Sequence, residues 1–406
     1  RKVQERGGHW NAYTSVNRTV YYIDGPADSW QIFLNLLTEL VFFPTFPEDE
    51  LEREKGVVRR EMAMYADDPD SVAYQLLMQT LYLKHPRRWP VLGEPAAFDC
   101  LTRQDVLDYH ASRYVPNNVV LSIAGDVDAA EIFSHLELLV EDLKSRPLNR
   151  ELIPHEPHQF GSRRVRKEFA VPYSKLNLAW RLPCSGHPDT PALSALASIL
   201  GGGRSARFYE KFHDRLGLVY SIEVHSNQSE TDEGAFTISI DVDRAQRDKV
   251  RDLVLQELRN LAQEDFTEDL KRVCKQTRVS RLRRRSSAAG VASEMGADWF
   301  GARNLNLSSE WQEAIERVTT EDLHRVCSTW LSSPNVTEVS LDPVGSNAAE
   351  EDGSAAGTET ALSEHVLGNG MKVVIREDHR LPLAYACLAF KAGCRAENEH
   401  DAGVTD

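Results

Sequence analysis

Leu51-Glu-Arg-Glu-Lys-Gly-Val-Val-Arg-Arg-Glu-Met-Ala-Met-Tyr65 is the stretch that decides the fold, and its apolar residues recur at the spacing of an amphipathic helix. It follows Pro47-Glu-Asp-Glu50. Proline fits the first turn of a helix, and carboxylates there face the positive end of the helix dipole, so we expect the helix to begin at this point. Steps of three and four residues place one set of side chains on a common face: Leu51, Glu54, Val58, Glu61 and Tyr65.

Two carboxylates, Glu54 and Glu61, interrupt this otherwise apolar face. An ionised carboxylate is costly to bury unless a cation or a metal compensates its charge. If the face points inward, the two residues therefore indicate a bound ligand. The alternative is that this edge of the helix is half exposed and that both carboxylates pair with neighbouring basic residues, namely Arg53, Lys55, Arg59 or Arg60. The helix by itself leaves both interpretations open.

The composition is that of a globular chain. Its 406 residues, 41% of them hydrophobic, are enough for two or more domains with real cores. A formal net charge of -15 argues against a general nucleic-acid binder, because phosphate neutralisation needs a basic face. We expect the basic cluster between Arg278 and Arg285 to be a solvated helix face or a partner for acidic residues. No apolar run has the length of a membrane span, and the compartment stays open between bacterial periplasm and cytoplasm.

The six cysteines are scattered and include no Cys-x-x-Cys pair. This pattern favours free, buried thiols over a disulfide framework or a zinc ribbon.

Internal repeats organise the sequence. The stretch 101–126 matches 318–343, with Thr102 and Thr319 offset by 217 residues, and each copy is predicted to be a Thr-capped helix, a Pro-Asn turn and a strand. A second match sets 171–184 beside 381–394, with an offset of 210 between Cys184 and Cys394. Periods of this length indicate duplicated domains rather than a solenoid of short repeats.

We therefore divide the chain into three repeats. Residues 1–148 form a first repeat that lacks its N-terminal part, 160–345 a complete second repeat, and 364–406 the truncated start of a third. The Gly/Ala/acidic run 346–363 reads as a flexible linker. Blocks of strands and helices within each repeat predict an α+β fold, a mixed sheet covered by helices.

The predicted elements of the first repeat are strands over 11–23 and 119–124 and helices over 29–41, 47–65 and 71–83. In the second repeat we expect strands over 176–182, 221–226 and 234–242. Its helices are expected over 190–200, 207–215 and 246–261, with a largely helical stretch over 266–299.

Several motifs then point to one family. They are Gly7-Gly-His-Trp-Asn-Ala-Tyr-Thr-Ser15, Glu54-Lys-Gly-Val-Val-Arg-Arg-Glu61, Tyr114-Val-Pro-Asn-Asn118, Gly217-Leu-Val-Tyr-Ser221 and Asn369-Gly-Met-Lys-Val-Val374. In combination they resemble the insulinase/pitrilysin family of zinc peptidases over nearly the whole chain. The resemblance implies paired α+β domains around a chamber in which peptides or unfolded short polypeptides are hydrolysed. It also implies a partner, either the second half of the same chain or a homologous subunit.

The resemblance also implies a zinc site. In the family, a His-x-x-Glu-His motif supplies two ligands and the general base, and a downstream glutamate is the third ligand. Glu61 matches that ligand, and Glu54 matches the carboxylate that orients the site. Zinc held by three protein ligands keeps a place for water and lowers its pKa. However, none of the 13 histidines lies in such a motif. Family spacing would place it before Arg1, so we interpret the sequence as a fragment that is inactive by itself.

Four residues are implied to bind substrate. Asn11 and Ala12 match the family's edge strand, which takes an extended peptide by main-chain hydrogen bonds. Tyr220 matches a tyrosine that anchors the peptide, and the alternative is that it is a core residue. His213 stands where the family has an arginine. Imidazole titrates near pH 6.5 when unperturbed, so anchoring is expected to be weaker or pH-dependent unless Arg215 replaces it.

Two rivals remain at this point. A non-catalytic relative could keep the fold as a scaffold or partner subunit, and a peptide-binding clamp could hold substrate without turnover. An intact His-x-x-Glu-His motif would favour the enzyme.

Overall fold

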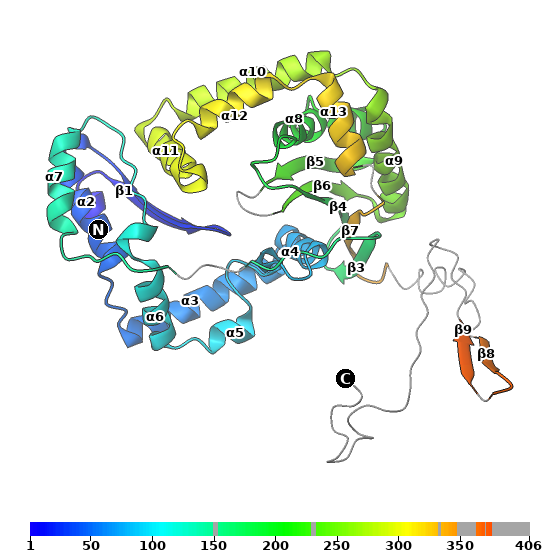
Figure 1. Cartoon of the computed structure of the whole chain (residues 1–406), viewed down its shortest axis with the longest axis horizontal. Coiled ribbons are helices and arrows are strands. Elements are labelled where there is room, and N and C mark those ends of the chain that lie inside the picture. Colours follow the sequence, from blue (N-terminus) through cyan, green and yellow to red (C-terminus); the bar gives the residue numbers. More distant parts are fainter. Residues whose placement is uncertain (149–152, 229–232, 332–333, 347–362, 370, 376–406) are drawn as a thin grey trace. The chain divides into compact units, whose positions relative to one another are not determined.

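The computed structural model describes residues 1–148, 153–228, 233–331, 334–346, 363–369 and 371–375. The chain divides into two units, Arg1–Ser346 and Asn347–Asp406, whose described residues are drawn as ribbons in Figure 1. In the smaller unit, the described strands β8 (Ser363–Val366) and β9 (Lys372–Ile375) form an antiparallel hairpin. Most of the predicted linker and the stretch 381–394 lie outside the described residues.

A five-stranded sheet forms the centre of the second repeat. Its strands lie in the order β3-β7-β4-β6-β5, with β3 parallel to β7 and the other pairs antiparallel. The sheet is therefore mixed, as predicted. Its strands are β3 (Arg163–Phe169), β4 (Ser174–Leu182), β5 (Val219–Asn227), β6 (Gly234–Val242) and β7 (Thr337–Pro343).

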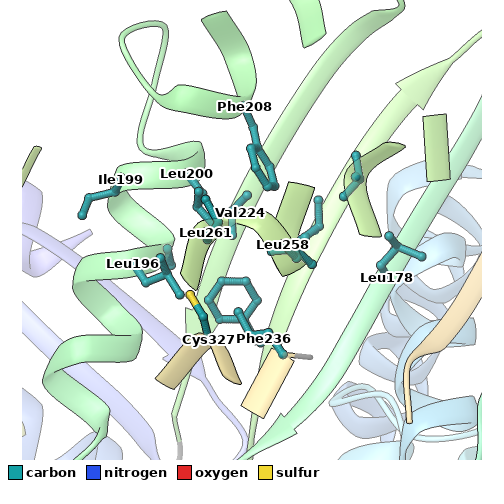
Figure 2. Close-up of a cluster of buried hydrophobic side chains, with 14 of the residues drawn as sticks. Leu178, Leu196, Ile199, Leu200, Phe208, Val224, Phe236, Leu258, Leu261 and Cys327 are labelled. Carbon is teal, nitrogen blue, oxygen red and sulfur yellow. The ribbon is translucent and has the colours of Figure 1, made fainter. Parts of the chain in front are cut away.

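One face of this sheet carries the main hydrophobic core. Leu178 of β4, Phe236 of β6 and Val224 of β5 pack there with Leu196 of α8 and Leu258 of α9 (Figure 2). Helix α8 is apolar nearly all round, which fits its burial. The α+β prediction of a mixed sheet covered by helices is confirmed for this repeat. Its helices are α8 (Thr190–Gly201), α9 (Arg247–Asn260), α10 (Thr267–Arg284), α11 (Ala288–Ala302), α12 (Leu307–Glu316) and α13 (Thr320–Val326).

The first repeat has a different balance of strands and helices. Its strands β1 (His9–Thr14) and β2 (Thr19–Asp24) form an antiparallel hairpin. The helices are α1 (Lys2–Glu5), α2 (Trp30–Phe42), α3 (Glu48–Asp67), α4 (Pro69–Leu81), α5 (Pro95–Asp99), α6 (Arg103–Arg113) and α7 (Ala129–Leu139). Adding the offset of 217 to the bounds of α2, α3 and α4 gives 247–259, 265–284 and 286–298, close to α9, α10 and α11.

Two strand predictions for the first repeat are wrong. The expected single strand over 11–23 is two strands, because the chain reverses direction after β1. The N–H of Ser15 donates to the Arg18 carbonyl in this turn, and β2 then pairs with β1. Residues 119–124 form no strand. Their counterpart in the second repeat does form one, β7, because β3 and β4 pair with it on either side. Within the described residues no strand pairs with 119–124 in this way.

Helix predictions from local signals fare better. The expected helices over 29–41, 47–65, 71–83, 190–200 and 246–261 correspond to α2, α3, α4, α8 and α9. The stretch over 207–215 is a π-helical segment, Tyr209–Arg215, and 266–299 contains α10 and α11. Both Thr-capped helices carry complete capping boxes, Thr102 with Asp105 and Thr319 with Asp322. Within the part of the chain that the structure describes, no helix has the length and hydropathy of a membrane span.

Helix α4 crosses from the first repeat to the face of the sheet opposite the main core. Leu77 and Leu81 pack there against Ala179 of β4 and Val339 of β7. Tyr82, which follows the helix, is completely buried, and its hydroxyl donates to the carbonyl oxygens of Glu233 and Gly234, each 3.1 Å away. The two repeats therefore share buried apolar and hydrogen-bonded contacts.

Tyr82→Phe tests this junction. The substitution removes the hydroxyl and leaves two carbonyl groups without that donor, so we expect the free energy of unfolding to fall by about 1 kcal/mol. Urea denaturation followed by circular dichroism measures it. Tyr65→Phe, at a tyrosine that is 48% exposed, is the control and should leave the midpoint unchanged. An equal effect of both substitutions would contradict the proposed role of the hydroxyl.

Candidate metal and peptide site

Helix α3 holds Glu61 half-buried and Glu54 exposed. Lys55 is its only buried residue, and the ammonium group of Lys55 donates to the Leu101 carbonyl at 2.6 Å. The buried side of the helix is therefore centred on Lys55. Glu54 and Glu61 share one side of the helix, but Glu54 is exposed, so the expectation that it lies on a buried inward face is wrong.

Neither carboxylate is neutralised by the basic residues around it. Arg53 pairs with Glu50, Lys55 with Glu52 and Arg59 with Asp99, at 2.9, 3.4 and 2.7 Å. The side chains of Glu54 and Glu61 make no hydrogen bond or ion pair with any residue that the structure describes. The described residues therefore do not form the local ion pairs with Glu54 and Glu61 that the sequence left open as an alternative. Both groups are available to a ligand.

An exposed apolar face surrounds Glu61 on α3. Val57, Met64 and Tyr65 are 42%, 62% and 48% exposed, and they lie four residues before Glu61 and three and four residues after it. Side chains at these spacings share one side of a helix. Large exposed apolar groups that lie together indicate a surface that another element covers. Glu61 therefore lies within a surface with the character of an interface.

A complete zinc site is not formed by the described residues. Structural and catalytic zinc sites use at least three protein ligands, and no group of three His, Cys, Asp or Glu side chains suited to a metal occurs among residues 1–346 and 363–375 as far as they are described. Glu61 fits the role of one oxygen ligand, because it is half-buried and unpaired. The other ligands implied by the resemblance have no counterpart in the 406 residues.

The hairpin presents a free edge at the residues expected to bind peptide. Asn11 is exposed and Ala12 half-buried, and β1 pairs with β2 alone among the described strands. The N–H of Ala12 donates to the side-chain oxygen of Asn11 at 2.8 Å rather than to β2. A main-chain donor of this edge is therefore turned outward, where an added strand could reach it.

Tyr220 is at the surface. Its side chain is 58% exposed at an irregularity of β5 between Val219 and Ser221, and its ring lies 5.1 Å from that of Tyr173. The alternative that Tyr220 belongs to the core is wrong, because the irregularity turns it out of the regular alternation.

His213 is engaged locally. Its ring stacks on Tyr209 at 4.4 Å between centroids, and its Nδ1 lies 2.7 Å from the Asp214 carboxylate. Arg215, the possible substitute, pairs with Glu210. The structure thus brings neither side chain into a hydrogen bond with Tyr220.

The second repeat carries opposite charges at the positions that match the two carboxylates. The offset of 217 takes Glu54 to Lys271 and Glu61 to Arg278, both on α10. Lys271 pairs with Glu268 at 2.7 Å and Arg278 with Glu316 at 2.8 Å. The basic cluster of α10 continues this pattern, since Arg281 and Arg285 both contact Glu294 of α11. Arg278, Arg281 and Arg285 therefore form ion pairs with acidic residues, as expected.

One polar cluster escaped the sequence analysis. Lys175 of β4 lies between Asp70 of α4 and Asp241 of β6, at 2.7 and 3.0 Å. Burial by itself would lower the pKa of Lys175, but the hydrogen bonds to Asp70 and Asp241 outweigh it, so the pKa is raised. No motif links these residues, because they come from three distant parts of the chain.

Comparison with known proteins now identifies the family. The family model described as insulinase (peptidase family M16) matches residues 1–94, and that described as peptidase M16 inactive domain matches residues 101–276. The chain belongs to peptidase family M16. The predicted resemblance is confirmed. The M16 inactive-domain match ends within α10, so it includes Lys271 but not Arg278.

Several M16 relatives are named zinc proteases. An uncharacterized zinc protease of Rickettsia felis is 26% identical over 341 residues, which cover 81% of this chain and 79% of that protein. The zinc protease PqqE of Helicobacter pylori is 26% identical over 352 residues, which cover 84% of this chain and 78% of the Helicobacter pylori protein. These names describe the relatives.

Solved structures support the same fold. A protease from Helicobacter pylori has a TM-score of 0.77 at 25% identity and covers 84% of this chain and 83% of its own. A peptidase M16 inactive domain from Pseudomonas fluorescens has a TM-score of 0.75 at 22% identity, covering 84% and 82%. At that identity the second likeness concerns the fold alone.

Proposed function

We propose that these 406 residues are part of an M16 zinc metalloendopeptidase that hydrolyses peptides or unfolded short polypeptides in a chamber between paired domains. The observation that carries the proposal is Glu61, a half-buried carboxylate without a partner among the described residues, on a helix whose neighbouring surface is apolar and exposed. Relatives named zinc proteases support it.

In this proposal each residue has a defined part. Glu61 is one zinc ligand, and Glu54 orients the site from beside it. Bound zinc would supply a water of lowered pKa and polarise the peptide carbonyl. A segment with the His-x-x-Glu-His motif would cover the apolar surface around Glu61 and bring the remaining ligands and the general base.

The substrate is held by this chain's own strands. An extended peptide would add to the free edge of β1, with the Ala12 N–H released from the Asn11 side chain to donate to it. Tyr220 would contact the peptide from β5, because its ring is exposed there. His213 would assist only after leaving its contacts with Tyr209 and Asp214. The paired domain comes from the second half of a longer chain or from a homologous subunit.

A non-catalytic scaffold or partner subunit is the second candidate. The observation that favours it is the pair of basic residues, Lys271 and Arg278, at the positions of α10 that match Glu54 and Glu61.

Zinc content and peptide hydrolysis of the natural full-length protein separate the candidates. For a peptidase we expect about one zinc per site, hydrolysis of an unstructured peptide, loss of hydrolysis with a chelator and recovery with added zinc. A protein without zinc and without hydrolysis would be the scaffold. Zinc together with peptide binding but no turnover would identify a clamp. Either of these results would refute the peptidase.

A further inference from the structure

A pocket of about 270 Å³ lies where α4 meets strands β4, β5 and β6. Helix α4 contributes Asp70 and Tyr74 to its wall. The strands contribute mostly polar side chains, among them Lys175, Asn177, Glu223, His225, Thr237 and Asp241. Glu61 is not among the residues that line this pocket.

The charges of the pocket do not balance. Its wall carries three carboxylates and one ammonium group. Lys175 is already held by Asp70 and Asp241, and the second oxygen of Asp241 accepts from Ser221 at 3.0 Å. Among the described residues the side chain of Glu223 pairs only with His225, at 3.3 Å, and it is 66% exposed. With a neutral imidazole, two negative charges remain in excess, and a cationic group would reduce this excess.

A hydroxyl in the wall is open to the pocket. Thr237 of β6 is 5% exposed and lines the pocket, and its side-chain hydroxyl makes no hydrogen bond with any described residue. That hydroxyl can therefore donate to or accept from a ligand in the pocket. Tyr74 of the same wall is 55% exposed. The pocket thus offers a hydrogen-bonding group and an aromatic ring in addition to its charge.

A chain of contacts joins the pocket to Tyr220. The Tyr220 ring lies 5.1 Å from the ring of Tyr173, and the Lys175 ammonium lies 5.6 Å from the centre of that ring. Tyr220 and Glu223 are also on one strand, three residues apart, which corresponds to about 10 Å of extended chain. A peptide in contact with Tyr220 can therefore place a long side chain in the pocket.

We propose that this pocket binds the cationic end of an arginine or lysine side chain of the peptide substrate, with Glu223 as the main charged partner. The inference deepens the proposed peptidase function and rests on it. Arginine suits the wall better than lysine, because its planar guanidinium forms paired hydrogen bonds with a carboxylate and stacks on an aromatic ring such as Tyr74. The pocket would thus give the protein a preference for basic peptides.

Peptide binding to the 406-residue chain tests the pocket without any need for hydrolysis. Two fluorescein-labelled peptides are compared by anisotropy, one with a single arginine and one with citrulline, its neutral isostere, at that position. We expect the arginine peptide to bind about 10-fold more tightly, because hydrogen bonds between two charged groups are stronger than those of a neutral donor. Glu223→Gln should reduce this ratio below about 2-fold. Glu268→Gln, at a side chain that is 84% exposed on α10, is the matched control and should leave it unchanged.

Equal affinities of the two peptides, or an unchanged ratio in Glu223→Gln, would overturn the assignment. Competition by spermidine that matches competition by the arginine peptide would also overturn it, because the pocket would then be a site for free cations. Glu61→Gln should not change the ratio. Failure of the pocket is therefore distinguishable from failure of the zinc assignment, which is read from metal content.

Discussion

Glu61→Gln in the natural full-length protein is expected to lower kcat/KM for peptide hydrolysis by more than 100-fold and to lower zinc content. Loss of a carboxylate that only orients a metal ligand already costs about 10- to 100-fold in affinity or activity, and a direct ligand contributes more. Glutamine keeps the size of the side chain but removes the charge. Because the side chain of Glu61 makes no hydrogen bond or ion pair with a described residue, the substitution should leave stability nearly unchanged. Metal analysis and a fluorogenic peptide assay measure the two effects.

Two further variants of α3 make this experiment specific. Glu54→Gln should cost about 10- to 100-fold in activity or zinc affinity, since we propose that Glu54 acts through the site rather than on the metal. Glu50→Gln, at an exposed residue paired with Arg53 on the same helix, should change neither quantity. If Glu61→Gln retained both zinc and activity, the metal-ligand assignment would be wrong.

Arg247→Met is expected to lower the free energy of unfolding by about 3 kcal/mol. Arg247 and Asp342 are both completely buried and form an ion pair, in which Ser174 and Ser340 also donate to the carboxylate. Removing the guanidinium leaves a buried carboxylate without its main counter-charge, and breaking such a pair typically costs roughly 3 to 5 kcal/mol. We expect the lower end, because Arg244 lies 3.8 Å from Asp342 and offsets part of the charge. Urea denaturation at neutral pH measures the loss.

Adding Asp342→Asn to Arg247→Met should recover at least half of that loss, because the buried charge is then removed with its partner. The surface control is Arg317→Met. Its side chain is 72% exposed and pairs with Glu313, so the expected change is within about 0.5 kcal/mol. A loss below about 1 kcal/mol for Arg247→Met would show that the buried pair does not stabilise the fold as argued.

The fold could be predicted from sequence where the signals are local. Helix α3 begins after Pro47, and α6 and α13 begin at Thr102 and Thr319 with their capping boxes, because caps and apolar spacing act within a few residues. Strand β3 was missed. Its sequence Arg163-Arg-Val-Arg-Lys-Glu-Phe169 is mostly charged, and it is a strand because β7 pairs with it.

The candidate site could be predicted only in part. Helix spacing singled out Glu54 and Glu61, and the family resemblance singled out Asn11, Ala12, His213 and Tyr220. The structure adds how each of them is placed. It shows that Glu54 is exposed rather than buried. The pocket around Glu223 has no sequence signal, since its walls come from α4 and from three strands of the other repeat.

By itself, the sequence determined the family, the helices with their caps and the identity of the unusual carboxylates. These features depend on residue type and on neighbours a few positions away. Only the tertiary structure decided that β7 became a strand and that the matching segment 119–124 did not. It also decided that α4 crosses to the second repeat and that Asp70 and Asp241 form ion pairs with Lys175. The physical reason is that strand pairing, burial and ion pairs require partners that are distant in sequence, and folding alone brings those partners together.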